Sequence, residues 1–234
     1  MLRDNKQFFI KLKEFKKSVA HFINHEKSSV EEIHTLRKSS RELLSLICKD
    51  EFIYKKIKKI IKLSNLVRDI DVFFDIYLES LPQKYISKLD IENIVKSTNK
   101  IRKKQIKKLH KYLETLFIPN HMEVEDKHMK YTNIDGNLLK LNQIELHQYR
   151  INIKKRLSIE KHRFLPNVKK VKVLSSIKNI LGLINDYYNG LEMLKEYQSE
   201  NVILIEVENY TYEQQYKLYR DFKRIVKDNS SELV

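Results

Sequence analysis

Glycine and proline are scarce in this chain, and their scarcity constrains the fold more than any other feature of the sequence. Only three glycines and three prolines are spread over 234 residues. These residues end helices and form the tight turns of β-sheet proteins, so a chain with few of them favours long helices. The hydrophobic content of 41% suffices for a buried core in a chain of this length. We therefore expect an all-α globular fold.

Apolar residues at helical spacing, together with end signals, predict seven helices. We expect them at roughly residues 5–25, 29–49, 51–80, 85–117, 138–163, 168–198 and 210–228. Ser28 or Ser29 is predicted to cap the second helix, with Glu32 in its acidic first turn. Pro82 is expected to open the fourth helix, and Pro119 helps to end it.

The stretch 118–137 is the best candidate for a linker between two halves. It contains a proline, a cluster of acidic residues and the turn pair Asp135-Gly136. The predicted domains are therefore residues 1–117 and 138–234, each a helical bundle. The second half has three predicted helices. A fourth would be short, lie in the linker, or come from a split at Gly182.

A basic helical stripe occurs twice in the sequence, about 113 residues apart. The first copy consists of His34, Arg37, Lys38 and Arg41, and the second of His147, Arg150, Lys154 and Lys155. On a helix the first four side chains fall within about 100° of arc, opposite Leu36 and Leu43. A solvated helix usually mixes acidic and basic residues, so a repeated cationic stripe favours a polyanion ligand. A solvated basic face is the alternative interpretation.

A second internal similarity supports a duplication. Residues 66–72 (LVRDIDV) follow the first stripe, and residues 181–186 (LGLIND) follow the second. Asp69 and Asp186 then lie 117 residues apart, close to the separation of the stripes. Two similarities in the same order indicate an internal repeat.

The charge balance agrees with a polyanion partner. The net charge is +15, from 46 Lys and Arg against 31 Asp and Glu, which attracts nucleic acid, anionic lipid or polyphosphate. A further row of candidate anion contacts on the fourth predicted helix consists of Lys100, Lys104, Lys107 and Lys111. This row, made of lysine alone, fits solvation as well as binding.

The carboxylates near the repeated segments are predicted to orient cations. Arg68, Asp69, Asp71 and Asp186 are assigned this structural role, because closely spaced aspartates without a third ligand are weak evidence for a metal. Residues of the predicted linker could hold a metal adventitiously, namely His121, Glu123, Glu125, Asp126 and His128. We expect no resident metal, no cofactor and no catalytic residues.

Sequence signals for export and membrane insertion are lacking. The first 24 residues have no continuous apolar core, and no apolar run could span a bilayer. The single cysteine, Cys48, lies on an apolar helical face and is interpreted as a buried structural thiol. A cytoplasmic location is therefore expected.

These motifs resemble the CHAD family, the conserved histidine α-helical domain. Its first half has a His, an Arg three residues later and an Arg seven later, matched by His34, Arg37 and Arg41. The family segment LGxxRDxDV is matched by residues 65–72 (NLVRDIDV). The second-half motifs are matched by His147, Arg150 and Lys154 with residues 181–186. The resemblance covers essentially the whole chain.

The resemblance implies two pseudo-twofold-related bundles whose basic faces line a shared surface or channel. It also implies binding of inorganic polyphosphate and location at polyphosphate granules. The residues that match the family's binding positions are His34, Arg37, Arg41, His147, Arg150 and Lys154. Glu42 departs from the pattern, because the family often has another Arg there. Residues 154–158 (KKRLS) depart from the usual KRLRY, which affects the expected line of the anion more than the fold.

The predicted function is thus a non-catalytic polyphosphate-binding module. A nucleic-acid-binding protein is the first alternative, since the same charge would support it. A metal-dependent phosphohydrolase using Asp69, Asp71 and Asp186 is the second alternative. Competition between polyphosphate and nucleic acid, and a test for chain shortening with Mg²⁺ or Mn²⁺, separate the three.

Overall fold

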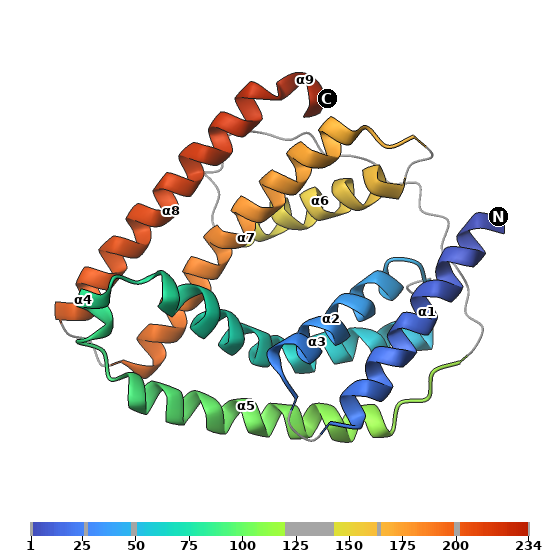
Figure 1. The fold of residues 1–234 in the computed structure, drawn as a ribbon, viewed down its shortest axis with the longest axis horizontal. Coiled ribbons are helices and arrows are strands. Elements are labelled where there is room, and N and C mark those ends of the chain that lie inside the picture. Colours follow the sequence, from blue (N-terminus) through green and yellow to red (C-terminus); the bar gives the residue numbers. More distant parts are fainter. Residues whose placement is uncertain are drawn as a thin grey trace. The chain divides into compact units, whose positions relative to one another are not determined.

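The computed structural model describes residues 2–25, 28–47, 51–119, 143–162, 165–198 and 202–233. All regular secondary structure in these ranges is helical (Figure 1), which confirms the all-α prediction. The described chain forms two compact units. Unit 1 contains the residues up to Phe74 and those from Ile91 to Pro119, and unit 2 contains Asp75–Asp90 and the residues from 143 onward. Cys48 and most of the predicted linker lie outside the described residues.

Unit 1 is a four-helix bundle. It consists of α1 (Leu2–Ile23), α2 (Val30–Leu44), α3 (Phe52–Val72) and α5 (Ile91–Glu114). α1 packs on α2, α2 on α3, α3 on α5, and α5 on α1. This cyclic order places α2 and α5 at diagonally opposite corners of the bundle.

The core of unit 1 comes from the apolar stripes of these helices. Its most buried members are Phe15 and Phe22 of α1, Ile33, Leu36 and Leu43 of α2, Ile57, Ile60 and Val67 of α3, and Leu109 of α5. The predicted cap of α2 is confirmed. The Ser29 Oγ accepts a hydrogen bond from the Glu32 N–H at 3.1 Å, and the Glu32 Oε2 accepts one from the Ser29 N–H at 2.7 Å. This reciprocal pair satisfies two backbone donors at the helix start.

Unit 2 is built around a long central helix. α6 (Gln143–His162) and α8 (Val202–Asp228) both pack on α7 (Val168–Tyr197), and the short α9 (Ser230–Leu233) contacts α7 and α8. The main core residues are Leu146, Ile153, Leu157, Leu174, Ile177, Leu181, Ile184 and Phe222. α7 continues through Gly182, so it is not split there.

The segment Asp75–Asp90 belongs to unit 2 through specific contacts with α7 and α8. α3 continues as the π-helix η1 (Phe73–Leu78), and α4 (Gln83–Ile86) follows it and packs on α8. The Tyr77 hydroxyl hydrogen-bonds the Thr211 Oγ1 at 2.9 Å, and burial raises the pKa of Tyr77. A Cβ on Gly190 of α7 would lie 2.6 Å from the Tyr77 Cβ and closer still to its Cγ.

Three predicted helices differ from the observed ones. The predicted helix 51–80 changes from α to π geometry at Phe73, and the predicted helix 85–117 is divided into α4 and α5. The predicted start at residue 210 was wrong, because α8 begins at Val202. Val202, Ile203 and Ile205 are β-branched and disfavour a helix locally, but Ile203, Leu204 and Val207 are buried, and that packing outweighs propensity.

Candidate anion-binding surface

α2 presents the first predicted stripe, but its four side chains do not share one environment. His34, Lys38 and Arg41 are exposed, whereas Arg37 is only 5% exposed. Ser29 and the acidic first turn start the helix, and the apolar stripe that includes Leu36 turns its other face to the core. The expectation that all these side chains face away from the core is therefore wrong for Arg37.

The Arg37 guanidinium links α2 to α3. Its Nη1 donates to the Ile61 carbonyl at 3.0 Å, the Ser64 Oγ at 2.8 Å and the Asn65 Oδ1 at 2.9 Å. Arg37 lies at the edge of the stripe nearest to α3, and its long side chain covers the helix–helix contact. These bonds hold the guanidinium in one orientation, so it is a fixed rather than a mobile cation.

Charges of both signs surround the Arg37 guanidinium. Burial, with smaller contributions from the charges of Arg41 and Arg68, lowers the pKa of Arg37 to about 10, and the carboxylates of Asp69 and Asp71 oppose this shift. Arg41 and Arg68 therefore lie close enough to repel the Arg37 guanidinium at the α2–α3 surface. A bound anion would reduce the repulsion among them, and the guanidinium fork matches phosphate oxygens.

Asp71 forms an ion pair with Arg102, a residue for which no role was predicted from the sequence. Its Oδ1 accepts from the Arg102 Nε of α5 at 2.8 Å, and the Arg102 terminal nitrogens donate to the Ser28 carbonyl at 3.3 Å. Among the described residues, the buried Asp71 Oδ2 has no hydrogen-bond partner. Arg102 is the one arginine in the lysine-rich sequence of α5, and that contrast was the signal for a structural role.

The second stripe, on α6, repeats this division between exposed and covered cations. His147 and Lys155 are exposed, Lys154 is partly exposed, and Arg150 is largely covered. The pKa of Arg150 lies below its ordinary value, because the effect of burial exceeds the opposing effect of the nearby Asp186 carboxylate. The Arg150 Nε is buried without a hydrogen-bond partner among the described residues.

Gly182 of α7 lies next to the Arg150 guanidinium. A Cβ on Gly182 would lie 3.6 Å from the Arg150 Nη2, which is an ordinary van der Waals distance. The next arginine of α6, Arg156, is buried and its Nη2 donates to the Leu233 carbonyl at 2.8 Å. Arg156 therefore secures the C-terminal end of unit 2, and it does not extend the stripe.

Each unit thus contains the same local arrangement. In unit 1 the stripe helix α2 packs on α3, and α3 packs on α5. In unit 2 the stripe helix α6 packs on α7, and α7 packs on α8. In both units the central arginine of the stripe, Arg37 or Arg150, is covered and has a carboxylate nearby, Asp69 or Asp186. This correspondence agrees with the predicted internal repeat.

The lysine row of α5 faces a different direction from the α2 stripe. All four lysines, Lys100, Lys104, Lys107 and Lys111, are exposed on the side opposite the buried Leu109 and Leu113. Because α2 and α5 are diagonal in the bundle, their outward faces point away from each other. The structure therefore does not bring the α5 row and the α2 stripe together.

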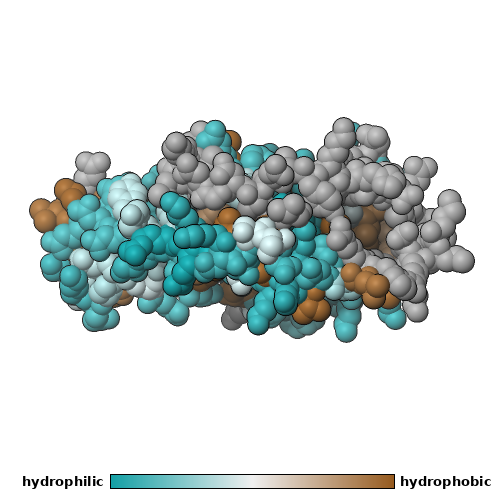
Figure 2. All heavy atoms as spheres, turned by 90° about the horizontal axis from the view of Figure 1, so that it is seen from above, coloured by the Kyte–Doolittle hydropathy of each residue, from teal (hydrophilic) through white to brown (hydrophobic). Residues whose placement is uncertain are grey.

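Hydrophilic side chains predominate among the described residues on the face shown in Figure 2.

Comparison with known proteins provides no relative. No protein-family model, no curated protein and no solved structure matches the chain. Within the described residues, no helix has the length and apolar character needed to cross a membrane. The predicted linker residues His121, Glu123, Glu125, Asp126 and His128 lie outside the described part of the chain.

Proposed function

We propose that the chain is a non-catalytic binding module for inorganic polyphosphate, of the CHAD type. The observation that carries this proposal is the repeated arrangement of an exposed histidine beside a covered arginine. His34 and Arg37 provide it in unit 1, and His147 and Arg150 provide it in unit 2. Repetition of a cationic group at the same place in two packed helix pairs favours a ligand over solvation.

The chemistry of these side chains suits a linear chain of phosphates. An exposed guanidinium such as that of Arg41 offers a planar fork to two phosphate oxygens, and the exposed Lys38 supplies a point charge. His34 can donate from a ring nitrogen. The proposal includes a pseudo-twofold relation of the two halves, a shared basic surface or channel, and a cytoplasmic location at polyphosphate granules.

Competition among polyanions tests the ligand class. The full chain is titrated with fluorescent long-chain polyphosphate, and the complex is challenged with unlabelled polyphosphate, RNA and DNA at equal phosphate concentration. We expect polyphosphate to displace the probe best, because α2 offers exposed cations and its sequence contains no Phe, Tyr or Trp on which bases could stack. Stronger displacement by RNA or DNA would favour nucleic-acid binding. Shortening of the polyphosphate with Mg²⁺ or Mn²⁺ would indicate a phosphohydrolase.

Two variants with the same charge change locate the binding surface. Lys38→Gln with Arg41→Gln removes an exposed lysine and an exposed arginine three residues apart on α2. Lys217→Gln with Arg220→Gln removes the same pair at the same spacing on α8. We expect the α2 variant to weaken polyphosphate binding about tenfold or more, since two charge-assisted contacts are lost. We expect the α8 variant to change it only about twofold.

Arg37 stays unchanged in this comparison because its removal would disturb the α2–α3 contact. Circular dichroism of both variants checks that the helices are intact. An equal loss of affinity in the two variants would mean that binding depends on net charge alone, and it would contradict a site at α2.

A further inference from the structure

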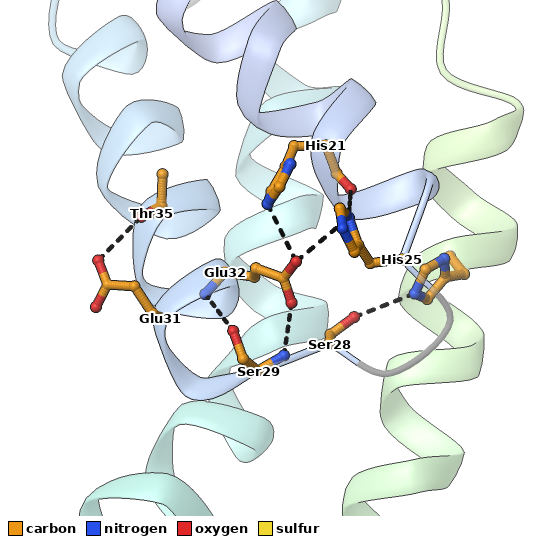
Figure 3. Close-up of polar contacts among 8 residues, drawn as sticks. His21, His25, Ser28, Ser29, Glu31, Glu32 and Thr35 are labelled. Atoms are coloured by element: carbon orange, nitrogen blue, oxygen red, sulfur yellow. Dashed lines mark hydrogen bonds and ion pairs between the residues drawn. The ribbon is translucent and has the colours of Figure 1, made fainter.

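Two histidines and a glutamate meet at the corner between α1 and α2 (Figure 3). His21 lies in the last turn of α1, His25 follows the end of that helix, and Glu32 lies in the first turn of α2. The centroids of the two imidazole rings lie 4.3 Å apart. We propose that His21, His25 and Glu32 form a binding site for a divalent transition metal, with Zn²⁺ as the best fit.

The distances suit a tetrahedral metal ion. One potential ligand atom from each of the three residues lies within 4.8 Å of the others. The His21 Nε2 and the Glu32 Oε1 are 3.2 Å apart. Zinc bonds of about 2.0–2.2 Å in a tetrahedral site place neighbouring ligand atoms roughly 3.3–3.6 Å apart. Only a small movement of exposed side chains would therefore bring them into coordination.

The surrounding hydrogen bonds orient two of the ligands. The Glu32 Oε2 is occupied by the Ser29 N–H at 2.7 Å, which leaves the Oε1 directed at the two imidazoles. The His25 Nδ1 lies 3.4 Å from the Glu32 Oε1 and 2.8 Å from the His21 carbonyl oxygen. Nδ1 is therefore the His25 atom that faces the other ligands. Metal binding at this nitrogen requires the tautomer protonated on Nε2 and replaces its contact with the carbonyl.

The corner is open to solvent. The Glu32 side chain is 13% exposed, whereas those of His21 and His25 are 57% and 50% exposed, so a metal can enter from solvent.

The ligand set indicates which metals fit. Two imidazoles and one carboxylate suit Zn²⁺, Co²⁺ or Ni²⁺ better than Mg²⁺ or Ca²⁺, which prefer oxygen ligands. Three protein ligands leave a fourth tetrahedral position open. A groove of about 520 Å³ between α1 and α2, lined in part by His21 and Glu32, gives solvent access to this corner. The site was not predicted from the sequence, because its ligands lie on both sides of the connection between α1 and α2.

Cobalt titration of the full chain tests the proposal. Co²⁺ alone is added at pH 7.5, and visible absorption is recorded because tetrahedral Co²⁺ absorbs strongly. Zn²⁺ is then added as a competitor. We expect a visible band that Zn²⁺ abolishes, and an at least tenfold weaker apparent affinity in His25→Ala and in Glu32→Gln.

The neighbouring glutamate provides a matched control. Glu31→Gln makes the same chemical change one residue away, on a side chain that accepts a hydrogen bond from Thr35 at 3.3 Å and points away from the histidines (Figure 3). We expect Glu31→Gln to bind Co²⁺ as the unchanged protein does. Glutamine at position 32 can still complete the helix cap, so helicity should remain.

Two results would overturn the metal site. One is the absence of a visible band up to millimolar Co²⁺. The other is equal affinity in Glu31→Gln and Glu32→Gln, which would assign the metal to other ligands. His25→Ala alters a different ligand and leaves the cap intact, so it decides the question independently of any effect on folding. No polyphosphate is present, so the outcome is separate from that of the proposed function.

Discussion

Asp71 and Arg102 illustrate how single buried charges hold unit 1 together. The Asp71 side chain is 3% exposed and the Arg102 side chain 19% exposed, and their 2.8 Å contact joins α3 to α5. A carboxylate in this environment depends on its cation, because loss of the partner leaves a buried charge uncompensated.

Removal of Arg102 should therefore destabilise unit 1 strongly. We expect Arg102→Ala to lower the free energy of unfolding by about 3 kcal/mol, measured by urea denaturation. The exposed neighbour Lys103→Ala should change it by less than about 0.5 kcal/mol.

A double variant separates the charge effect from lost packing. Asp71→Asn combined with Arg102→Ala should recover part of the lost stability, because the buried carboxylate is then neutral. Additive losses in the two single variants would show that the ion pair is not what stabilises this contact.

The cationic residues of the α2 stripe could be predicted from the sequence, but the extent to which each one is buried could not. The periodicity correctly placed His34, Lys38 and Arg41 on the outer side of α2. It could not show that Arg37, at the edge of the same arc, reaches back to three acceptors on α3. The reach of a long side chain depends on its neighbours in space, which a single sequence does not provide.

At the scale of helices, the ends with a local signal were predicted and those set by packing were not. Ser29 starts α2 as expected. α7 begins at residue 168 as predicted, two residues after Pro166, and there the Asn167 side chain accepts from the Lys170 N–H at 3.0 Å. The change to π geometry at Phe73 and the early start of α8 at Val202 have no such local signal. Both depend on contacts within the folded chain.

The two glycines of α7 should respond oppositely to alanine. Gly190→Ala would place a methyl group against the buried Tyr77, so we expect a loss of about 1–3 kcal/mol in the free energy of unfolding. At Gly182 the nearest atom is 3.6 Å away and belongs to a flexible arginine. Gly182→Ala should therefore gain up to about 1 kcal/mol from helix propensity. Urea denaturation of both variants gives the comparison, and destabilisation by Gly182→Ala would contradict it.

For the molecule as a whole, the predicted division into 1–117 and 138–234 is simpler than the observed grouping. The structure groups Asp75–Asp90 with unit 2, and the chain returns to unit 1 at Ile91. An internal repeat predicts two halves that are each continuous in sequence. Sequence similarity does not reveal that one segment of the first half packs with the second unit. That packing depends on contacts such as the hydrogen bond of Tyr77 with Thr211.

Polyphosphate binding should weaken steeply with salt. A net charge of +15 and two stripes would neutralise about six to eight phosphates, which predicts a slope of roughly −4 to −6 for log K against log salt concentration. Titrations between low and physiological salt measure this slope. A slope near zero would contradict an electrostatic site.

The excursion of Asp75–Asp90 has a consequence for any attempt to divide the protein. A single cut between α5 and α6 leaves the N-terminal fragment with a piece of chain whose packing partners are gone. The C-terminal fragment lacks that same piece, including the ring that fills the space beside Gly190. Neither fragment is a complete folding unit, so the two halves should need to be synthesised as one chain or mixed to restore each other.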